Sequence, residues 1–165
     1  MFGSDRTLYM AGNTLYTVST TSATTTAIGS IGFQSGGDLA FVGGYLYMAS
    51  DSNKLIQVNV NTGLGTKIGD LGVSQMFGLA TPDNATLYGV AGQNIYTINV
   101  STGGATFQST FNPILSGGAF GLSFYTEAGA TGTPGTTVVP EPGIFAVLGI
   151  GLVSMGFARR RKANY

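Results

Sequence analysis

The segment "LIQVNVNTGLGTKIGDLG", residues 55–72, has a close match on either side of itself in the chain. Forty residues earlier the sequence reads "LYTVSTTSATTTAIGSIG" (15–32), and forty residues later it reads "IYTINVSTGGATFQSTFN" (95–112). A fixed period of this length is typical of repeat architectures, in which every repeat is one small unit of secondary structure. The spacing therefore predicts three similar units.

Each matched segment predicts two strands joined by a turn. Apolar residues stand at 56, 58 and 60 and polar ones at 57 and 59, and residues 96–100 follow the same alternation. A period of two is typical of half-buried β-strands. The turns are "NTG" (61–63) and "STG" (101–103), where glycine adopts positive φ at no steric cost and a side-chain oxygen can close the turn. The first unit has "TSA" (21–23) instead, which predicts a weaker turn.

Two further apolar stretches precede each pair. One set is "TLYMAG" (7–12), "YLYMAS" (45–50) and "TLYGVAG" (86–92), and the other is "GDLAFV" (37–42), "FGLATP" (77–82) and "AFGLSFY" (119–125). Each unit thus predicts four short antiparallel strands over about 40 residues, the size of one propeller blade. Along the chain the opening unit lacks its first strand, two complete units follow, and the last stretch (119–125) could complete the opening unit.

These repeats resemble bacterial propeller repeats of the form "LYxVNxxTGxxTxIGxLG", most closely in the second unit. The resemblance implies an all-β fold of about three four-stranded, propeller-like blades over residues 1–128. A β-sandwich or a β-solenoid is the alternative. Because closed propellers usually have about four to eight blades, we expect an incomplete propeller.

Two explanations of the missing blades remain open. One is a homodimer that closes into a six-bladed ring, and the other is a chain whose N-terminal part is truncated. The first residues contain no basic region followed by an apolar stretch, so they do not read as a secretory signal peptide. Truncation would account for both observations.

The composition limits the chemistry of the chain. Charged residues make up 8%, and residues 1–139 carry three cations and six anions, a net charge of −3. A surface of that sign argues against nucleic acid as a partner. The chain has no cysteine, which removes thiol nucleophiles and cysteine metal sites, and no histidine, which removes the commonest general base and metal ligand. We therefore expect a non-enzymatic protein with no metal site and no cofactor.

The remaining candidates for chemistry are aspartates and tyrosines. The aspartates at 38, 51, 70 and 83 lie in or beside predicted turns, where aspartate commonly bonds its own backbone. "DSN" (51–53) and "PDN" (82–84) lack the alternating oxygen ligands of a calcium loop. The tyrosines at 9, 16, 47, 88 and 96 recur with the repeat, and blade packing explains them better than a sugar-stacking surface.

The C-terminal end, "VVPEPGIFAVLGIGLVSMGFARRRKANY" (138–165), has a different character. An uncharged run of 16 residues (143–158) would span about 24 Å as a helix, with prolines before it and four consecutive cations after it. Prolines stop a helix from extending backwards, and a basic cluster suits cytoplasmic headgroups. These flanks predict a single transmembrane helix over 143–158, preceded by a Gly/Thr/Pro linker at 129–139.

This arrangement resembles the PEP-CTERM sorting signal of Gram-negative bacteria, which an exosortase recognises. The resemblance assigns residues 140–165 to the signal. It implies that Pro140, Glu141, Pro142 and Gly143 form the sorting motif and that the basic stop cluster is Arg159, Arg160, Arg161 and Lys162. A plain membrane anchor and a buried helix are the alternatives.

The resemblance also implies a function. Such proteins are exported to the cell surface or matrix and are associated with exopolysaccharide and biofilm, so the expected partners are an exosortase, the membrane and polysaccharide. Positive charge stays inside, which predicts a cytoplasmic C-terminus before processing. The alternative function is a truncated polysaccharide-active propeller enzyme whose catalytic residues lie outside the given sequence.

Overall fold

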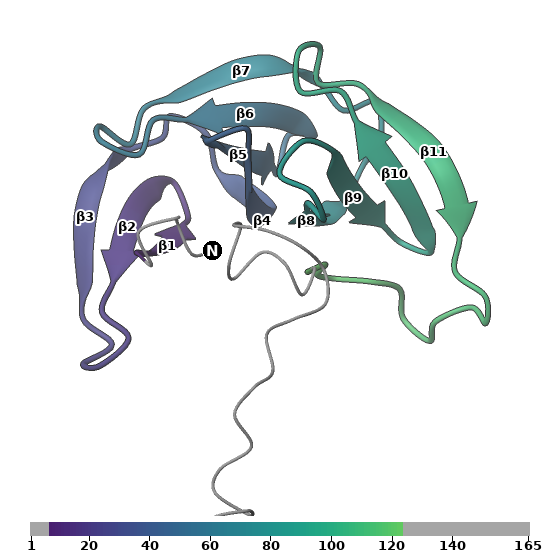
Figure 1. Cartoon of the computed structure of the whole chain (residues 1–165), viewed down its shortest axis with the longest axis horizontal. Helices are drawn as coiled ribbons and strands as arrows, with labels where there is room; N and C mark the ends of the chain where they lie inside the picture. Colours follow the sequence, from purple (N-terminus) through teal and green to yellow (C-terminus); the bar gives the residue numbers. More distant parts are fainter. Residues whose placement is uncertain (1–6, 124–165) are drawn as a thin grey trace, which may run out of the picture. The chain divides into compact units, whose positions relative to one another are not determined.

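The computed structural model describes residues 7–123, and within them every regular element is a β-strand (Figure 1). The eleven strands in this part of the chain form three separate sheets. The first sheet contains β1 (Leu8–Ala11), β2 (Thr14–Val18) and β3 (Thr25–Ser30). The second contains β4 (Ser35–Val42), β5 (Tyr45–Ser50), β6 (Lys54–Val58) and β7 (Gly65–Asp70). The third contains β8 (Met76–Ala80), β9 (Leu87–Ala91), β10 (Asn94–Ile98) and β11 (Ala105–Thr110).

Each sheet is a simple antiparallel meander, with strands in chain order. The predicted sequence of strands is confirmed: three strands in the opening unit and four in each of the next two. The arrangement is compatible with a propeller-like fold, and the all-β class is confirmed for residues 7–123.

The three sheets repeat one another in register as well as in order. The pairing of the last two strands shifts by one residue between Leu15 and Tyr16, between Leu55 and Ile56, and between Ile95 and Tyr96. These bulges lie forty residues apart. Because a bulge twists and bends its strand, all three outer strands curve at the same place.

The prediction of a strand over 119–125 is not confirmed in the described part of that stretch. Ala119 makes a single antiparallel bridge to Gly92, and residues 120–123 belong to no strand. The segment still packs on the third sheet: Phe120 lies 5.5 Å from Phe77, and a Cβ on Gly78 would be 2.6 Å from the Leu122 nitrogen. Residues 120–123 thus lie against β8 without joining a sheet of their own.

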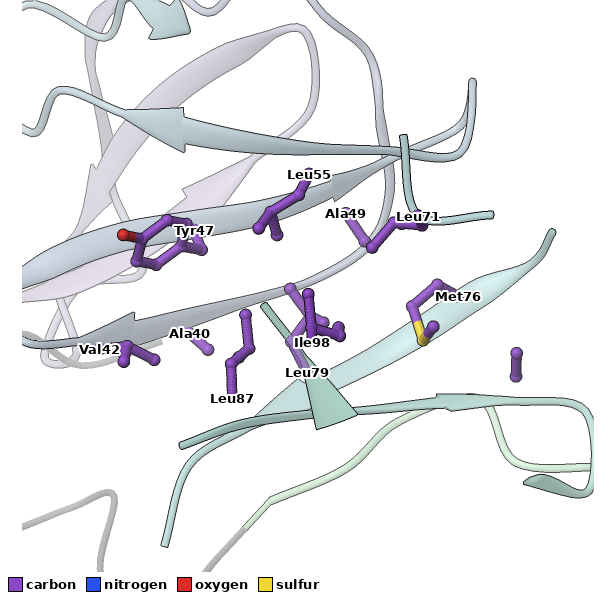
Figure 2. Packing of buried hydrophobic residues seen from close by; sticks show 11 residues of the cluster. Ala40, Val42, Tyr47, Ala49, Leu55, Leu71, Met76, Leu79, Leu87 and Ile98 are labelled. Atoms are coloured by element: carbon purple, nitrogen blue, oxygen red, sulfur yellow. The ribbon is translucent and has the colours of Figure 1, made fainter. Parts of the chain in front are cut away.

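The apolar core lies between neighbouring sheets. One buried cluster joins the first two sheets and includes Leu15, Ile31 and Ile56. The other joins the second and third sheets, and Figure 2 shows Tyr47 and Leu55 on one side of it with Leu79 on the other. Since each sheet alone exposes its apolar face, the sheets are stable only when stacked.

No helix in residues 7–123 is long and apolar enough to cross a membrane. The predicted helix over 143–158 and the linker over 129–139 lie outside the described residues.

Candidate functional site

The turn between the last two strands is built in the same way in all three sheets. Asn59 Oδ1 accepts hydrogen bonds from the backbone N–H groups of Asn61 (2.9 Å) and Thr62 (3.2 Å). Asn99 makes the matching pair of bonds in the third sheet, and Ser19 accepts one such bond in the first. The side chain two residues before the triplet thus makes the shorter bonds, while Thr62 Oγ1 of the triplet accepts a longer one from Leu64 N–H (3.3 Å).

Glycine ends the turns of the second and third sheets where the sequence predicts it. Gly63 has φ of 78° and Gly103 has φ of 83°, while Ala23 takes the same place in the first sheet with φ of 55°. Positive φ strains a residue that carries a Cβ. The turn of the first sheet forms nonetheless, with Ala23 N–H donating to the Ser19 carbonyl (2.9 Å) as Gly63 N–H donates to that of Asn59 (2.8 Å).

These turns also join one sheet to the next. Gly63 lies against Gly29 of β3, and Gly103 lies against Gly69 of β7. A Cβ on Gly63 would be 2.6 Å from the Gly29 carbonyl carbon, and one on Gly69 would be 2.8 Å from the carbonyl carbon of Thr102. The junction thus needs glycine on both sides because the two backbones touch.

Backbone hydrogen bonds reinforce each junction. Gly65 N–H donates to the Ile31 carbonyl (3.0 Å), and forty residues later Ala105 N–H donates to the Leu71 carbonyl (3.0 Å). The two acceptors follow β3 and β7 directly, and both side chains are buried. Neighbouring sheets are therefore joined by main-chain groups as well as by the core.

A hollow of about 260 Å³ with a mixed polar and apolar lining lies where the second and third sheets meet. Asn53 and Gln75 both line it in left-handed conformations, and Gln75 N–H donates to Asn53 Oδ1 (3.3 Å). Asp51 and Phe77 also line it, and the Phe77 ring lies 5.5 Å from the ring of Phe120. The rest of the lining is Gly36, Ser50, Ser74 and Met76. Polar side chains of this kind can donate and accept hydrogen bonds.

The predicted structural role of Asp83 is confirmed by its bonds. Its carboxylate accepts from the N–H groups of Ala85 (2.9 Å) and Thr86 (2.7 Å) and from the Thr86 hydroxyl (2.9 Å). These bonds favour the ionised form and lower the pKa of Asp83 to about 2. The loop that contains "PDN" (82–84) is therefore held by hydrogen bonds between Asp83 and the residues that follow it.

Two other aspartates have different surroundings. The hydrogen bond from Lys67 Nζ (2.8 Å) lowers the pKa of the exposed Asp70, and Lys54 lies 3.6 Å away. Burial raises the pKa of Asp38, although the N–H groups of Leu39 and Leu79 oppose that rise. Within residues 7–123 no three potential ligands among aspartate and glutamate gather as a metal centre would require.

The recurring tyrosines pack against the sheets as expected. Tyr47 is buried, and the other four are half-buried. The Tyr9 ring meets Phe41 edge-on at 5.7 Å, and the Tyr96 ring meets Phe107 at 6.0 Å. They do not form an exposed aromatic surface.

The sorting residues from Pro140 to Gly143 and from Arg159 to Lys162 lie outside the described residues, and comparison of the sequence with known families bears on them instead. Residues 138–162 match the PEP-CTERM protein-sorting motif. A chain that carries this motif is an exported surface protein that inserts into the membrane and is processed by an exosortase.

Comparison with whole proteins adds little. No curated protein matches the chain. Among solved structures, the chain is similar to Kuenenia stuttgartiensis hydrazine synthase, with 16% identity over 67% of this chain and 35% of that one, and a TM-score of 0.48. The match thus covers about a third of the hydrazine synthase chain.

Sequence reasoning missed the residues that build the junctions. Gly29 and Gly69 recur as "IG" in the repeat, and Asn59 and Asn99 recur two residues before the turn triplet. Both signals are visible in the aligned repeats. What the sequence does not show is that the turn of one unit contacts the outer strand of the preceding unit.

Proposed function

We propose that this protein is a non-enzymatic surface or matrix protein of a Gram-negative bacterium, in which the sheet region is a binding or structural module. The PEP-CTERM motif at 138–162 is the observation that carries the proposal. In this account the motif delivers the module, and the stacked sheets interact with exopolysaccharide or the biofilm matrix outside the cell.

The C-terminal segment inserts as a helix over 143–158 with its end in the cytoplasm. The four cations at 159–162 support this orientation, because basic clusters stay on the cytoplasmic side. The chain has no cysteine, so a single Ala163→Cys variant would report its own side of the membrane. Trapped before cleavage, it should resist a membrane-impermeant maleimide until the cells are permeabilised. Labelling of intact cells would contradict the orientation.

The roles of the carboxylates support binding over hydrolysis. A glycosidase needs two carboxyl groups on either side of a bond, with one kept protonated. Asp83 is hydrogen-bonded within its own loop and Asp70 is paired with two lysines, which leaves Asp38 and Asp51 as the other described carboxylates. The hollow lined by Asp51, Ser50, Asn53 and Ser74 offers hydrogen-bonding groups, which are suited to a sugar unit. We assign polysaccharide contact to this hollow.

A glycan array combined with a hydrolysis assay on the same purified sample tests this assignment. Binding without release of reducing ends is expected. Asp51→Ala and Ser74→Ala should each weaken binding, while Thr66→Ala, on an exposed position of β7, should not. Release of reducing ends would instead favour the enzyme alternative, and equal binding by all three variants would place the ligand elsewhere.

A ring of two copies, suggested by the repeat count, makes a specific structural demand. Its closure through the same junction would require the turn of the first sheet in one copy to dock onto β11 of the other. Ala23 of that turn and Ser109 of β11 would then lie at the contact between the two copies.

A further inference from the structure

The junctions between sheets follow one rule inside the stack. A turn glycine of one sheet meets a strand glycine of the preceding sheet, as Gly63 meets Gly29 and Gly103 meets Gly69. Both turn glycines are buried by the contact, and the strand glycines are half-buried. The two outermost sheets among residues 7–123 carry the same positions of the repeat and can be compared with this rule.

The outer face of β11 breaks the rule with a serine. Ser109 stands forty residues after Gly69, and it is exposed. On Gly69 a Cβ would overlap the docked turn, since it would be 2.8 Å from the Thr102 carbonyl carbon. Ser109 carries that Cβ and a hydroxyl beyond it. A turn that approached β11 in the same geometry would therefore collide with its side chain.

The neighbouring residues of β11 point to the same conclusion. Ile28 and Ile68 are half-buried beside the strand glycines, whereas the equivalent residue of β11 is the exposed Gln108. Phe107 is 55% exposed, but its ring edge packs on Tyr96 of its own sheet. An outer face with polar residues at the contact positions is typical of a terminal repeat.

The opposite end breaks the rule with an alanine. Ala23 stands forty residues before Gly63, has φ of 55° and is exposed. A Cβ on Gly63 would lie 2.6 Å from the Gly29 carbonyl carbon, and one on Gly103 would lie 2.7 Å from the Gly69 Cα. The methyl group of Ala23 thus occupies the space that the strand backbone of a preceding sheet takes at both internal junctions.

We propose that Ala23 and Ser109 are steric stops that keep a second copy of the chain from docking onto either end of the stack. A head-to-tail contact between copies would bring the Ala23 methyl and the Ser109 side chain into the same small space, where the internal junctions have only backbone. Each of these two side chains would meet main-chain atoms of the other copy. Main-chain atoms cannot move aside as the end of a flexible side chain can, so the two copies do not associate. Without the stops, the repeat geometry would favour closed rings or open chains.

Sedimentation velocity of the full chain in detergent solution tests the proposal. Wild type should sediment as one copy, and Ala23→Gly combined with Ser109→Gly should associate at least about tenfold more tightly. Because either Cβ alone blocks the contact, neither single variant should associate. This dependence on both residues separates a steric stop from a general change in surface polarity.

Two matched measurements keep the test decisive. Thr66→Gly should stay a single copy, and circular dichroism melts should show that every variant remains folded. A folded double variant that does not associate would overturn the proposal. It would also be overturned by a wild-type dimer that Ser109→Trp disrupts, since the β11 face would then already be an interface.

Discussion

Gly103, at the end of the turn before β11, lies directly against Gly69 of β7, so that a Cβ on Gly103 would be 2.7 Å from the Gly69 Cα. The same contact joins Gly63 to Gly29 forty residues earlier. Two glycines from neighbouring repeats thus form one contact. The contact recurs with the forty-residue period of the sequence.

Gly69→Ala should destabilise the protein by about 1–3 kcal/mol, because the added methyl group meets main-chain atoms that cannot repack. Urea unfolding measures the loss. Gly12→Ala is the matched control, since a Cβ there would have nothing within 4 Å. Equal stability of the two variants would mean that the turn does not touch β7.

Gly63→Val and Gly103→Val should each cost at least about 1 kcal/mol, because a β-branched residue at positive φ is strained. Ala23→Gly should be neutral or mildly stabilising, since its φ of 55° already favours glycine and Ala23 is exposed among residues 7–123. Urea melts of the three variants provide the comparison. Equal tolerance at all three positions would contradict the turn assignment.

Asn59→Ala should lower the free energy of unfolding by about 1 kcal/mol, because two backbone N–H groups lose their acceptor. Asn61→Ala should change it much less, since the turn uses the backbone N–H of Asn61 and not its side chain. Thermal melts of the two variants at one pH distinguish these roles. A larger loss for Asn61→Ala would mean that the triplet closes its own turn.

Asp83 should make stability fall in acid. Its pKa is about 2 in the folded protein and 3.8 as the ordinary value, so its contribution is complete above pH 3.8 and disappears as the pH falls towards 2. The advantage of wild type over Asp83→Asn in urea melts should shrink across this window. A difference that stays constant down to pH 2 would contradict the bonding of the carboxylate.

Asp38 should have the opposite effect. Burial raises its pKa above 3.8, so its contribution to stability is largest in acid and falls as the pH rises through the folded pKa. Asp38→Asn keeps an oxygen for the Leu39 N–H and removes the buried charge. This variant should therefore be more stable than wild type at pH 7 but not at pH 3, as judged by urea unfolding.

The strand order was predictable from the repeat because alternating apolar residues and turn glycines are local signals. The junction was not, since the contact of Gly29 with Gly63 joins two repeats and depends on how the sheets stack. The stretch at 119–125 resembles β8 in sequence, yet residues 119–123 make only one bridge. An inner strand needs a neighbouring strand to pair with, and sequence similarity alone does not supply one.

The candidate functional residues were also predictable from the sequence only in part. The PEP-CTERM residues were predictable because a short linear motif carries its signal in consecutive residues. The hollow beside Asp51 was not, because residues 50–53 and 74–77 come together only when the second and third sheets stack.

Intact mass of the mature protein from an exosortase-containing host tests the central claim most directly. We predict a chain that ends near Pro140–Pro142 and lacks the apolar run and the basic cluster. Replacement of Pro140, Glu141 and Pro142 by alanine should preserve the full length, as should a host without exosortase. A mature wild-type protein that retains residues 143–165 in the exosortase-containing host would contradict processing and leave a plain membrane anchor.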